Sequence, residues 1–547
     1  MQNFHDYITA GYCGILHRLL AKERVKQGSK HNLKRAQKEI QKLMPSRNKW
    51  LRLHQRIRCK DMCKETANIL SICKTIASDI KRYGTGSPEK PEYLTELKKF
   101  TDSLADIALG NTEMSFSKGD FTIIPKFKGD EGIDAIYRPL CIYNNLKTKV
   151  LISAASAYFT QSFDPHLHTE ILSYRPRRQY HGQMTTTNGN HAIKAIKEYI
   201  GRQRNKNIYV AECDIQKFFD IINHDVVLDC FDRLARKAGI PDYEQARNIL
   251  KQYLDSYGFV PDVLSLNDNE NYWKNPLRLY RGKVKGRLMF KWVNEDDFLQ
   301  AYSKEEFAAE RNRLGVPQGG ALSCVISNVV LNDVDQVIVA DLDPDRLFVR
   351  YGDDIILMHT DREKCEELLE KYKKALLKHK LIFHKFENFS DLKDGEKNTK
   401  KFWKGKSKPV FLWGRGEGNA SEWIGFVGYE IHREGHTRLR LSTLDKKFKD
   451  VNRKYHKCLN AKHSSCEKHV RNVIERMETL PESLAKFSEL ENNIPLQRQL
   501  RRLDKFRYRK LEKLDTKLSK KYNQEVQIKE VFESNEGVSF FKKIGND

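Results

Sequence analysis

The sequence lacks the features that mark secreted and membrane proteins. Its eleven cysteines are scattered over 547 residues and form no Cys-x-x-Cys pair, which argues against a disulfide framework and for reduced thiols. It contains no run of eighteen apolar residues, no apolar signal segment and no lipidation motif. We therefore expect a soluble cytoplasmic protein without a membrane partner.

Acidic residues are also fewer than basic residues in this sequence. The chain has 73 Asp and Glu against 98 Lys and Arg, which gives a formal net charge of +25. A balance this basic implies a polyanionic partner, and nucleic acid is the first candidate. Hydrophobic residues at 39% and aromatic residues at 10% indicate a folded chain, and its length allows several domains.

One cluster of possible zinc ligands falls near the C-terminal end: Cys458, His463, Cys466 and His469. The residue types suit zinc, but the spacing matches none of the usual fingers or knuckles, and the segment is charged and helical in character. We favour an ordinary helical segment and leave metal binding open.

Residues 347–358 carry the strongest chemical signal. Two apolar runs of strand character flank Gly352-Asp353-Asp354, a composition typical of a β-hairpin with a tight turn. Adjacent carboxylates repel each other unless a cation lies between them, and a divalent metal ion is the usual cation. A surface turn that happens to contain two aspartates explains the hairpin alone equally well.

Two further segments bear on this choice. The apolar run 208–213 predicts a strand that ends at Asp214, where a carboxylate can face an acid at the tip of a neighbouring hairpin. Residues 314–323 form a Gly-rich loop before an apolar helix predicted over 325–335. The loop lacks the Gly-Lys-Ser/Thr ending of a Walker A loop, and no strand directly precedes it, so it is not a dinucleotide fingerprint.

Basic residues gather in three places. Residues 21–60 hold fourteen cationic against two anionic side chains, and residues 498–522 hold eleven against three, which favours contacts with a phosphate backbone over a merely solvated helix face. A predicted two-stranded flap carries Lys126, Lys128 and Arg138, a set of cations that suits a triphosphate.

Taken in order, the strand-end Asp214, the loop 315–320 and the Tyr351–Asp354 turn resemble the palm of reverse transcriptases. The closest resemblance is to bacterial enzymes of the group II intron and retron kind. It spans residues 115–435 and includes the segments 173–176 and 424–429. Three motifs in series are far more specific than any one of them.

The resemblance implies an α+β right-hand polymerase with fingers, a palm built on an antiparallel sheet, a helical thumb, and helical N- and C-terminal extensions. The implied boundaries are a basic helical extension over 1–100, fingers over 101–205, a palm over 206–435 with an insertion at about 255–312, and a thumb with a basic extension over 436–547. To the insertion itself, polar and irregular with a weak strand pair around 277–291, the sequence assigns no chemistry.

The resemblance also implies roles for individual residues. Asp214, Asp353 and Asp354 would be catalytic and, with the carbonyl of Ile215, would hold two Mg²⁺ ions, with Mn²⁺ as an alternative. Such ions, about 4 Å apart, activate the attacking hydroxyl and neutralise the leaving pyrophosphate. The implied nucleotide-binding residues are Lys126, Lys128, Arg138, Phe219, Gln318 and Gly319. The implied primer and template contacts are Arg175, Tyr351, Gly425 and Gly428.

Phe219 stands five residues after Asp214, where a bulky ring would clash with a ribose 2′-hydroxyl. RNA-dependent RNA polymerases, which share the Gly-Asp-Asp turn, typically have Asp at this place, and Asp220 here comes one residue too late. We therefore expect the use of dNTPs.

The resemblance has departures. Cys324 replaces the proline that often follows the loop serine, the retron Val-Thr-Gly triplet is absent, and no Cys/His-rich endonuclease module follows the thumb. What remains resembles the stand-alone reverse transcriptases of phage defence, including abortive-infection types, which often act with a dedicated noncoding RNA.

The expected function is therefore RNA-directed DNA synthesis, with RNA, DNA product and dNTPs as partners and a homo-oligomer left open. The alternatives are a non-catalytic or maturase-like RNA-binding protein on a polymerase scaffold, untemplated or protein-primed DNA synthesis, and an RNA-dependent RNA polymerase.

Overall fold

The computed structural model describes most of the chain. The described residues are 12–27, 35–54, 64–84, 89–112, 116–127, 136–175, 177–180, 183–186, 189–241, 243–274, 290–340, 342–386, 402, 404–416, 420–461, 465–477 and 493–528. Of the predicted site residues, Lys128 lies outside this set, as do His463 and most of the strand pair expected around 277–291.

The centre of the molecule is a five-stranded sheet with the order β6-β7-β5-β8-β9. Its strands are β5 (Tyr209–Asp214), β6 (Arg346–Tyr351), β7 (Asp354–His359), β8 (Lys408–Trp413) and β9 (Ala420–Ser421). All neighbouring pairs are antiparallel except β8 and β9. The β-branched and aromatic residues of these segments favour extended backbone, and the predicted antiparallel palm sheet is confirmed.

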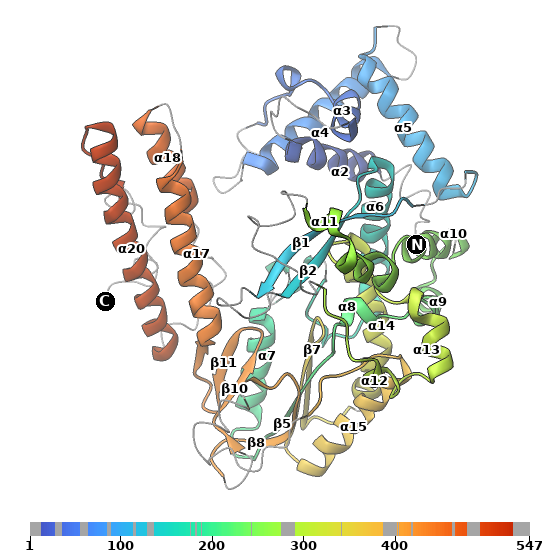
Figure 1. Cartoon of the computed structure of the whole chain (residues 1–547), viewed down its shortest axis with the longest axis vertical. Helices are drawn as coiled ribbons and strands as arrows, with labels where there is room; N and C mark the ends of the chain where they lie inside the picture. Colours follow the sequence, from blue (N-terminus) through green and yellow to red (C-terminus); the bar gives the residue numbers. More distant parts are fainter. Residues whose placement is uncertain are drawn as a thin grey trace.

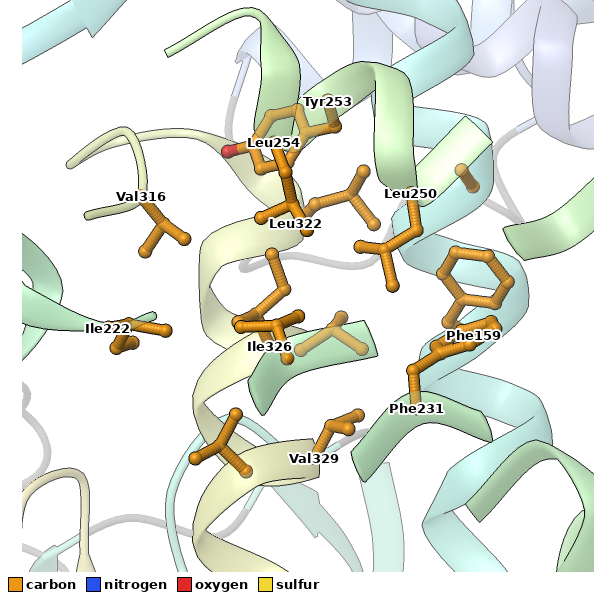
Figure 2. Packing of buried hydrophobic residues seen from close by; sticks show 14 of the residues in the cluster. Phe159, Ile222, Phe231, Leu250, Tyr253, Leu254, Val316, Leu322, Ile326 and Val329 are labelled. Atoms are coloured by element: carbon orange, nitrogen blue, oxygen red, sulfur yellow. The ribbon is translucent and has the colours of Figure 1, made fainter. Parts of the chain in front are cut away.

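Helices cover one face of this sheet and bury most of the hydrophobic core. They are α6 (Leu146–Phe163), α9 (His224–Ala238), α10 (Tyr243–Asp255), α14 (Ala321–Val339) and α15 (Arg362–Lys378). Figure 2 shows how Ile326 and Val329 of α14 pack near Phe231 of α9 and Phe159 of α6. Phe159 and Phe231 meet edge to face with ring centroids 5.1 Å apart, an arrangement that aromatic pairs prefer.

Helix α14 is the one described helix that is long and apolar enough to cross a membrane, and 67% of its apolar window is buried inside the fold. Most of its side chains are buried because α6, α9 and α15 pack against it. It extends beyond both ends of the predicted 325–335 helix.

The N-terminal part is helical, as expected, and leads into the flap. Its elements are α2 (Tyr12–Gln27), α3 (Arg35–Lys42), α4 (Lys64–Tyr83), α5 (Glu92–Leu109), the antiparallel pair β1 (Asp120–Phe127) and β2 (Ile136–Ile142), the pair β3 (Arg177–Tyr180) and β4 (Gln183–Thr186), and α7 (Gly189–Arg202). Figure 1 shows α2, α3 and α4 grouped at the top of the molecule, next to α6.

The C-terminal part is a small sheet followed by long helices. Its elements are β10 (Trp423–Phe426), β11 (Tyr429–His432), β12 (Thr437–Leu439), α17 (Leu441–Leu459), α18 (Cys466–Met477) and α20 (Ile494–Tyr522). Helices α17 and α20 lie side by side at the edge of the molecule in Figure 1. The leucines at helical spacing in α20, among them Leu511, Leu514 and Leu518, are buried. Most of the cations of α20 are exposed, but Arg507 is buried at 1% exposure.

The insertion at about 255–312 is more ordered than its composition suggests. Its short elements are α11 (Glu270–Lys274), α12 (Glu295–Phe298), α13 (Lys304–Glu310) and the single turns Phe259–Val263, Leu264–Asp268 and Arg311–Arg313. The short helix α8 (Phe218–Ile221) directly follows β5. Tyr257, Phe259 and Phe290 form a small core of their own against Phe121 of β1. Residues 381–386, an apolar segment after α15, make only two isolated bridges, at Phe383 and Phe386.

A buried ion pair ties the sheet to α14. The side chains of Arg350 on β6 and Asp335 on α14 are both 0% exposed, with Nε 2.6 Å from Oδ2. Arg350 also donates through Nη1 to the carbonyl of Gly352 and to Asn328. Burial raises the pKa of Asp335 to about 6, although Arg350 opposes the shift.

We expect Asp335→Ala to lower the free energy of unfolding by about 3–5 kcal/mol, because it leaves a buried guanidinium without its counter-charge. Urea unfolding followed by circular dichroism measures the change. Arg362→Ala, which removes an exposed pair with Glu366 on α15, should change stability by less than about 1 kcal/mol. Equal effects of the two substitutions would contradict the prediction.

Candidate active site

Sheet register brings three carboxylates together. Asp214, the last residue of β5, pairs directly with Asp354, the first residue of β7. Asp353 precedes Asp354 in the turn between β6 and β7, where Tyr351 pairs with Asp354. Gly352 has φ +74°, a value that glycine adopts readily and that a two-residue hairpin turn requires. Residues 140 positions apart in sequence thus share one end of the sheet.

Buried contacts fix the shape of this turn. The backbone N–H of Gly352 donates to Oγ of Ser173 at 2.7 Å, and Nη1 of Arg350 donates to the Gly352 carbonyl at 3.1 Å. Because both groups of Gly352 are held, the two turn aspartates have little freedom to move apart. The turn is therefore a rigid platform for its acids.

Burial and the proximity of the acids raise the pKa values of Asp353 and Asp354. Desolvation in the cleft, followed by the charges of Asp214 and Asp353, raises the pKa of Asp354 to about 7. The pKa of Asp353 is also raised, by desolvation first and by Asp214 second. Shifts of this kind mark carboxylates that lack sufficient positive charge around them.

A lysine that the sequence did not single out supplies part of that charge. Nζ of Lys406 donates to Oδ2 of Asp214 at 2.5 Å. Burial alone would lower the pKa of Lys406, but Asp214 outweighs it and raises the value. His384 approaches the same Oδ2 at 3.9 Å. The sequence offered no specific signal for Lys406, which lies two residues before the observed β8.

The donor set fits divalent ions. Three carboxylates at one sheet end are the oxygen ligands that Mg²⁺ and Mn²⁺ prefer. Ile215 lines the same cleft. Its bridge to Phe383 uses the Gln216 N–H and the Asp214 carbonyl and does not use the Ile215 carbonyl, which thus remains suited to a metal ion.

The acids open into a cleft of about 500 Å³. Arg138, Phe219 and Gln318, three of the predicted nucleotide-binding residues, also line it. The side chain of Gln318 donates to Asp220 at 2.6 Å, so the loop is braced against the segment that carries Phe219. Lys126 is placed by its backbone in β1.

Gly319, in contrast to Gln318, does not line this cleft. It lines a separate cavity of about 390 Å³ that faces α2. A Cβ at this position would come within 2.3 Å of Cδ1 of Leu140, so Gly319 is needed for β2 to pass close to the loop. The structure does not bring it to the carboxylates.

The insertion closes the cleft, a role that sequence reasoning missed entirely. Residues 290–294 line it opposite the acids. Lys217 donates to the carbonyl of Lys291 at 2.8 Å, and the ring of Trp292 stacks between Phe259 and Phe298 with centroids 5.0 and 5.4 Å away. These contacts hold residues 290–294, which are distant in sequence from the acids, in place as one wall of the cleft.

The predicted primer and template residues divide into two groups. Gly425 and Gly428 lie on the β10–β11 hairpin, where a Cβ at Gly425 would meet the guanidinium of Arg440. Tyr351 adjoins the acidic turn. Arg175 is instead buried, and its guanidinium is bound by Asp164 and by the carbonyls of His168 and Ile171, so the structure does not place it on the cleft. Its neighbour Tyr174, 45% exposed with φ +56°, lines the cleft instead.

This geometry agrees with a family comparison. Residues 278–391 match a family model described as reverse transcriptase (RNA-dependent DNA polymerase). The match includes the Gly-rich loop and the acidic hairpin. It confirms the predicted enzyme class, an RNA-directed DNA polymerase. Asp214 lies outside the matched range, and the β5–β7 register joins it to the matched segment.

Comparisons with whole proteins are more distant. No curated protein matches the chain. Solved structures with a similar arrangement include the Candida tropicalis telomerase with a fragment of telomeric RNA, at 12% identity and a TM-score of 0.37, covering 86% of this chain and 70% of that one. The corresponding Candida albicans telomerase has 12% identity and a TM-score of 0.35, with 89% and 73% covered. These values are too low to bear on function.

The suspected zinc cluster is partly described. Both ring nitrogens of His469 are engaged, one with the carbonyl of Cys458 at 2.6 Å and the other with the hydroxyl of Tyr522 at 2.9 Å. Cys458 and Cys466 are buried, and neither forms a disulfide with another described residue. These contacts favour a packing role for His469.

Another group of potential ligands lies behind the sheet. Cys230, Asp333 and His379 each place one ligand atom within 4.8 Å of the others. Arg233 and His379 both hydrogen-bond to Oδ2 of Asp333, and together they lower the pKa of Asp333 to about 2, with His379 first. An ion-pair network accounts for this group.

The Gly-rich loop is anchored by a buried histidine at the start of α9. Nε2 of His224 lies 2.7 Å from the carbonyl of Gly315, so the neutral ring donates through Nε2. Burial lowers the pKa of His224 to about 4. An unfolded chain would bind a proton at the usual value near 6.5.

We expect this histidine to make stability depend on pH. Because the folded pKa lies below the unfolded one, its contribution is fully present above pH 6.5 and is lost as the pH falls toward 4, on the order of 3 kcal/mol in total. His224→Gln, which retains a donor but does not titrate, should flatten the decline of urea midpoints between pH 6.5 and 4.5. An equally steep decline in the variant would refute the assignment.

Proposed function

We propose that the chain is a reverse transcriptase that copies RNA into DNA from dNTPs by nucleotidyl transfer assisted by two divalent ions, Mg²⁺ or Mn²⁺. One observation carries the proposal: β5 and β7 pair in a register that sets Asp214 opposite Asp354 and beside Asp353, at the floor of a cleft of nucleotide size. The match of residues 278–391 to the reverse transcriptase family supports it.

Asp214, Asp353 and Asp354 would hold the ions together with the carbonyl of Ile215. Bound ions in such a site lower the pKa of the attacking hydroxyl and neutralise the leaving pyrophosphate. Lys406, which holds Oδ2 of Asp214, would keep that carboxylate ionised and oriented before the ions bind. The rigid turn around Gly352 fixes the relative positions of the acids, which is the positioning that this chemistry requires.

The cleft walls would bind the nucleotide. Arg138 on β2 lines the same cleft as the acids and would contact the triphosphate, with Lys126 and Lys128 of the same flap. Gln318 would shape the pocket from the loop side. Phe219 would lie beneath the sugar and exclude a 2′-hydroxyl. Gly425, Gly428 and Tyr351 would contact primer or template.

The biological setting we propose is phage defence, with a dedicated noncoding RNA as template. The support is the resemblance of the loop 315–320 and of the segments 350–354 and 424–429 to bacterial group II intron and retron-like enzymes, and a net charge of +25 that suits a large RNA partner. The proposed domain boundaries are those expected from the sequence.

We expect Asp353→Asn to abolish dNTP incorporation on a primed RNA template, with a loss of at least about 100-fold, while the fold and RNA retention persist. Asp296→Asn, an exposed aspartate in α12, is the matched control and should retain full activity. Sequencing the nucleic acid that co-purifies with each protein identifies the template. A single abundant RNA with DNA that vanishes in Asp353→Asn supports templated synthesis.

Two outcomes would overturn parts of this proposal. RNA that is identical in both proteins, with no incorporation by the wild type, would establish an RNA-binding scaffold on a polymerase fold. DNA without a matching RNA would establish untemplated or protein-primed synthesis.

We expect Phe219→Ala to relax sugar discrimination, because it removes the ring that would clash with a 2′-hydroxyl. The ratio of kcat/KM for dNTP to that for NTP should fall by about 10-fold or more, a loss of roughly 1.4 kcal/mol of discrimination. Phe218→Leu, which changes the buried neighbour, controls for general loosening. Persistent dNTP use with negligible NTP use in Phe219→Ala would show that another residue selects the sugar.

A further inference from the structure

A second large cavity lies far from the carboxylates. It has a volume of about 940 Å³ and is lined by the end of α7 and the turn after it, the end of β8, and the turn between β11 and β12. Asn207, two residues before the start of β5, lines this cavity. Asp214, at the end of β5, lies seven residues later in the chain. At about 3.3 Å per residue, the two sites are separated by roughly 20 Å. Figure 1 shows β8, β10 and β11 at the lower end of the molecule, away from the N-terminal helices.

The lining is strongly cationic. Among its sixteen residues there are five Lys or Arg and a single carboxylate, Glu434. The cations come from three separate elements: Lys197, Arg204 and Lys206 from α7 and its turn, Arg415 from the end of β8, and Arg433 from the end of β11. Two of these cations form exposed ion pairs, Lys206 with Asp345 and Arg415 with Glu422. Arg204 forms no ion pair with any described residue.

The guanidinium of Arg433 is fixed in place at this cavity by hydrogen bonds. Its Nη2 donates to the carbonyls of Gln203, Arg204 and Lys206, at 3.1, 3.3 and 2.8 Å, and its guanidinium lies 6.0 Å from the ring of Trp413. These partners are neutral, so the positive charge is held in place but is not cancelled. Burial lowers the pKa of Arg433, as expected for a cation without an anionic partner.

The floor of the cavity leaves room for a ligand. A Cβ added at Gly201 or Gly435 would meet no atom within 4 Å, and one at Gly414 would meet only Cγ of Arg433 at 3.9 Å. Trp413 is 1% exposed beneath Arg433, so it offers no ring face for a base to stack on. The lining therefore offers a ligand mainly positive charge and hydrogen bonding, with His436 as its one exposed aromatic ring, a set of groups that suits the sugar–phosphate backbone.

We propose that this cavity binds the sugar–phosphate backbone of an RNA strand and so holds the template RNA at the end of the palm sheet remote from the cleft. The identity of the RNA as a template rests on the proposed function. Cations spread over three elements fit a strand that runs along the cavity better than a single free nucleotide, which would also need a wall for its base.

The test uses the full chain with Arg204→Ala and Arg415→Ala together. Both side chains are exposed, and Arg433 is left intact because it holds the turn after α7. Arg362→Ala with Lys371→Ala on α15 is the control, since it also removes two exposed cations. Each protein is titrated with a long RNA that carries the template and with a minimal primer–template, over a range of salt concentrations.

We expect the double variant to weaken binding of the long RNA and to reduce its log–log salt slope by about 1.4, which is 0.7 for each lost phosphate contact. The control and the minimal primer–template should be unaffected, including the rate of dNTP incorporation. Ultraviolet crosslinking of the long RNA should label peptides from 197–207 or 412–416 in the wild type and lose that label in the variant.

Three results would overturn the inference. They are an unchanged salt slope with the long RNA, an equal loss with the minimal primer–template, and loss of binding of inorganic phosphate or dNTP without a change for RNA. Failure of the proposed function would look different: the wild type would not incorporate dNTPs on the minimal primer–template, whatever the RNA titrations show.

Discussion

Mutual repulsion among three carboxylates is the constraint on which the rest of this structure depends. Asp214, Asp353 and Asp354 meet at one end of the central sheet, and the raised pKa of Asp354 reflects that crowding after desolvation. A flexible chain would relieve the repulsion by moving the acids apart. Here backbone pairing, the hydroxyl of Ser173 and the guanidinium of Arg350 prevent it, so the repulsion remains available to favour a divalent ion.

The support for these acids extends well behind the sheet. Arg350 can hold the turn only because Asp335 on α14 compensates its charge in a fully buried pair. Helix α14 is in turn fixed by α6, α9 and α15, whose packing forms the main core (Figure 2). The loop that opens α14 is held by His224, so that the same helix positions both the acidic turn and Gln318. Helix packing and the buried ion pair thus both fix the positions of the acids and of Gln318.

The excess positive charge is not uniform over the molecule. Lys406 and Arg138 face the acids, the outer faces of α17 and α20 carry long rows of lysine and arginine, and Arg433 holds an uncancelled charge about 20 Å from the carboxylates. A nucleic acid that contacts more than one of these regions would gain affinity from each, because backbone contacts act through counterion release and are largely independent of sequence.

The sequence determined what depends on local patterns. The apolar runs around Gly352-Asp353-Asp354 and before Asp214 predicted the strands, and their residue types predicted the chemistry, because turn geometry and strand preference are set by neighbouring residues. Helix α14 followed from the same kind of signal, although its ends did not. The interpretation of Arg175 as a nucleic-acid contact did not anticipate that Asp164 and two carbonyls would bury it.

Only the tertiary structure decided which distant residues meet. No local pattern shows that Lys406 reaches Asp214, that residues 290–294 close the nucleotide side of the cleft, or that Arg433 caps the turn after α7. These contacts join segments that are far apart in the sequence: Lys406 is 192 positions from Asp214, Lys291 is 74 positions from Lys217, and Arg433 is up to 230 positions from the carbonyls that it binds. They arise because sheet register and helix packing bring such segments together, and that information lies in the fold as a whole.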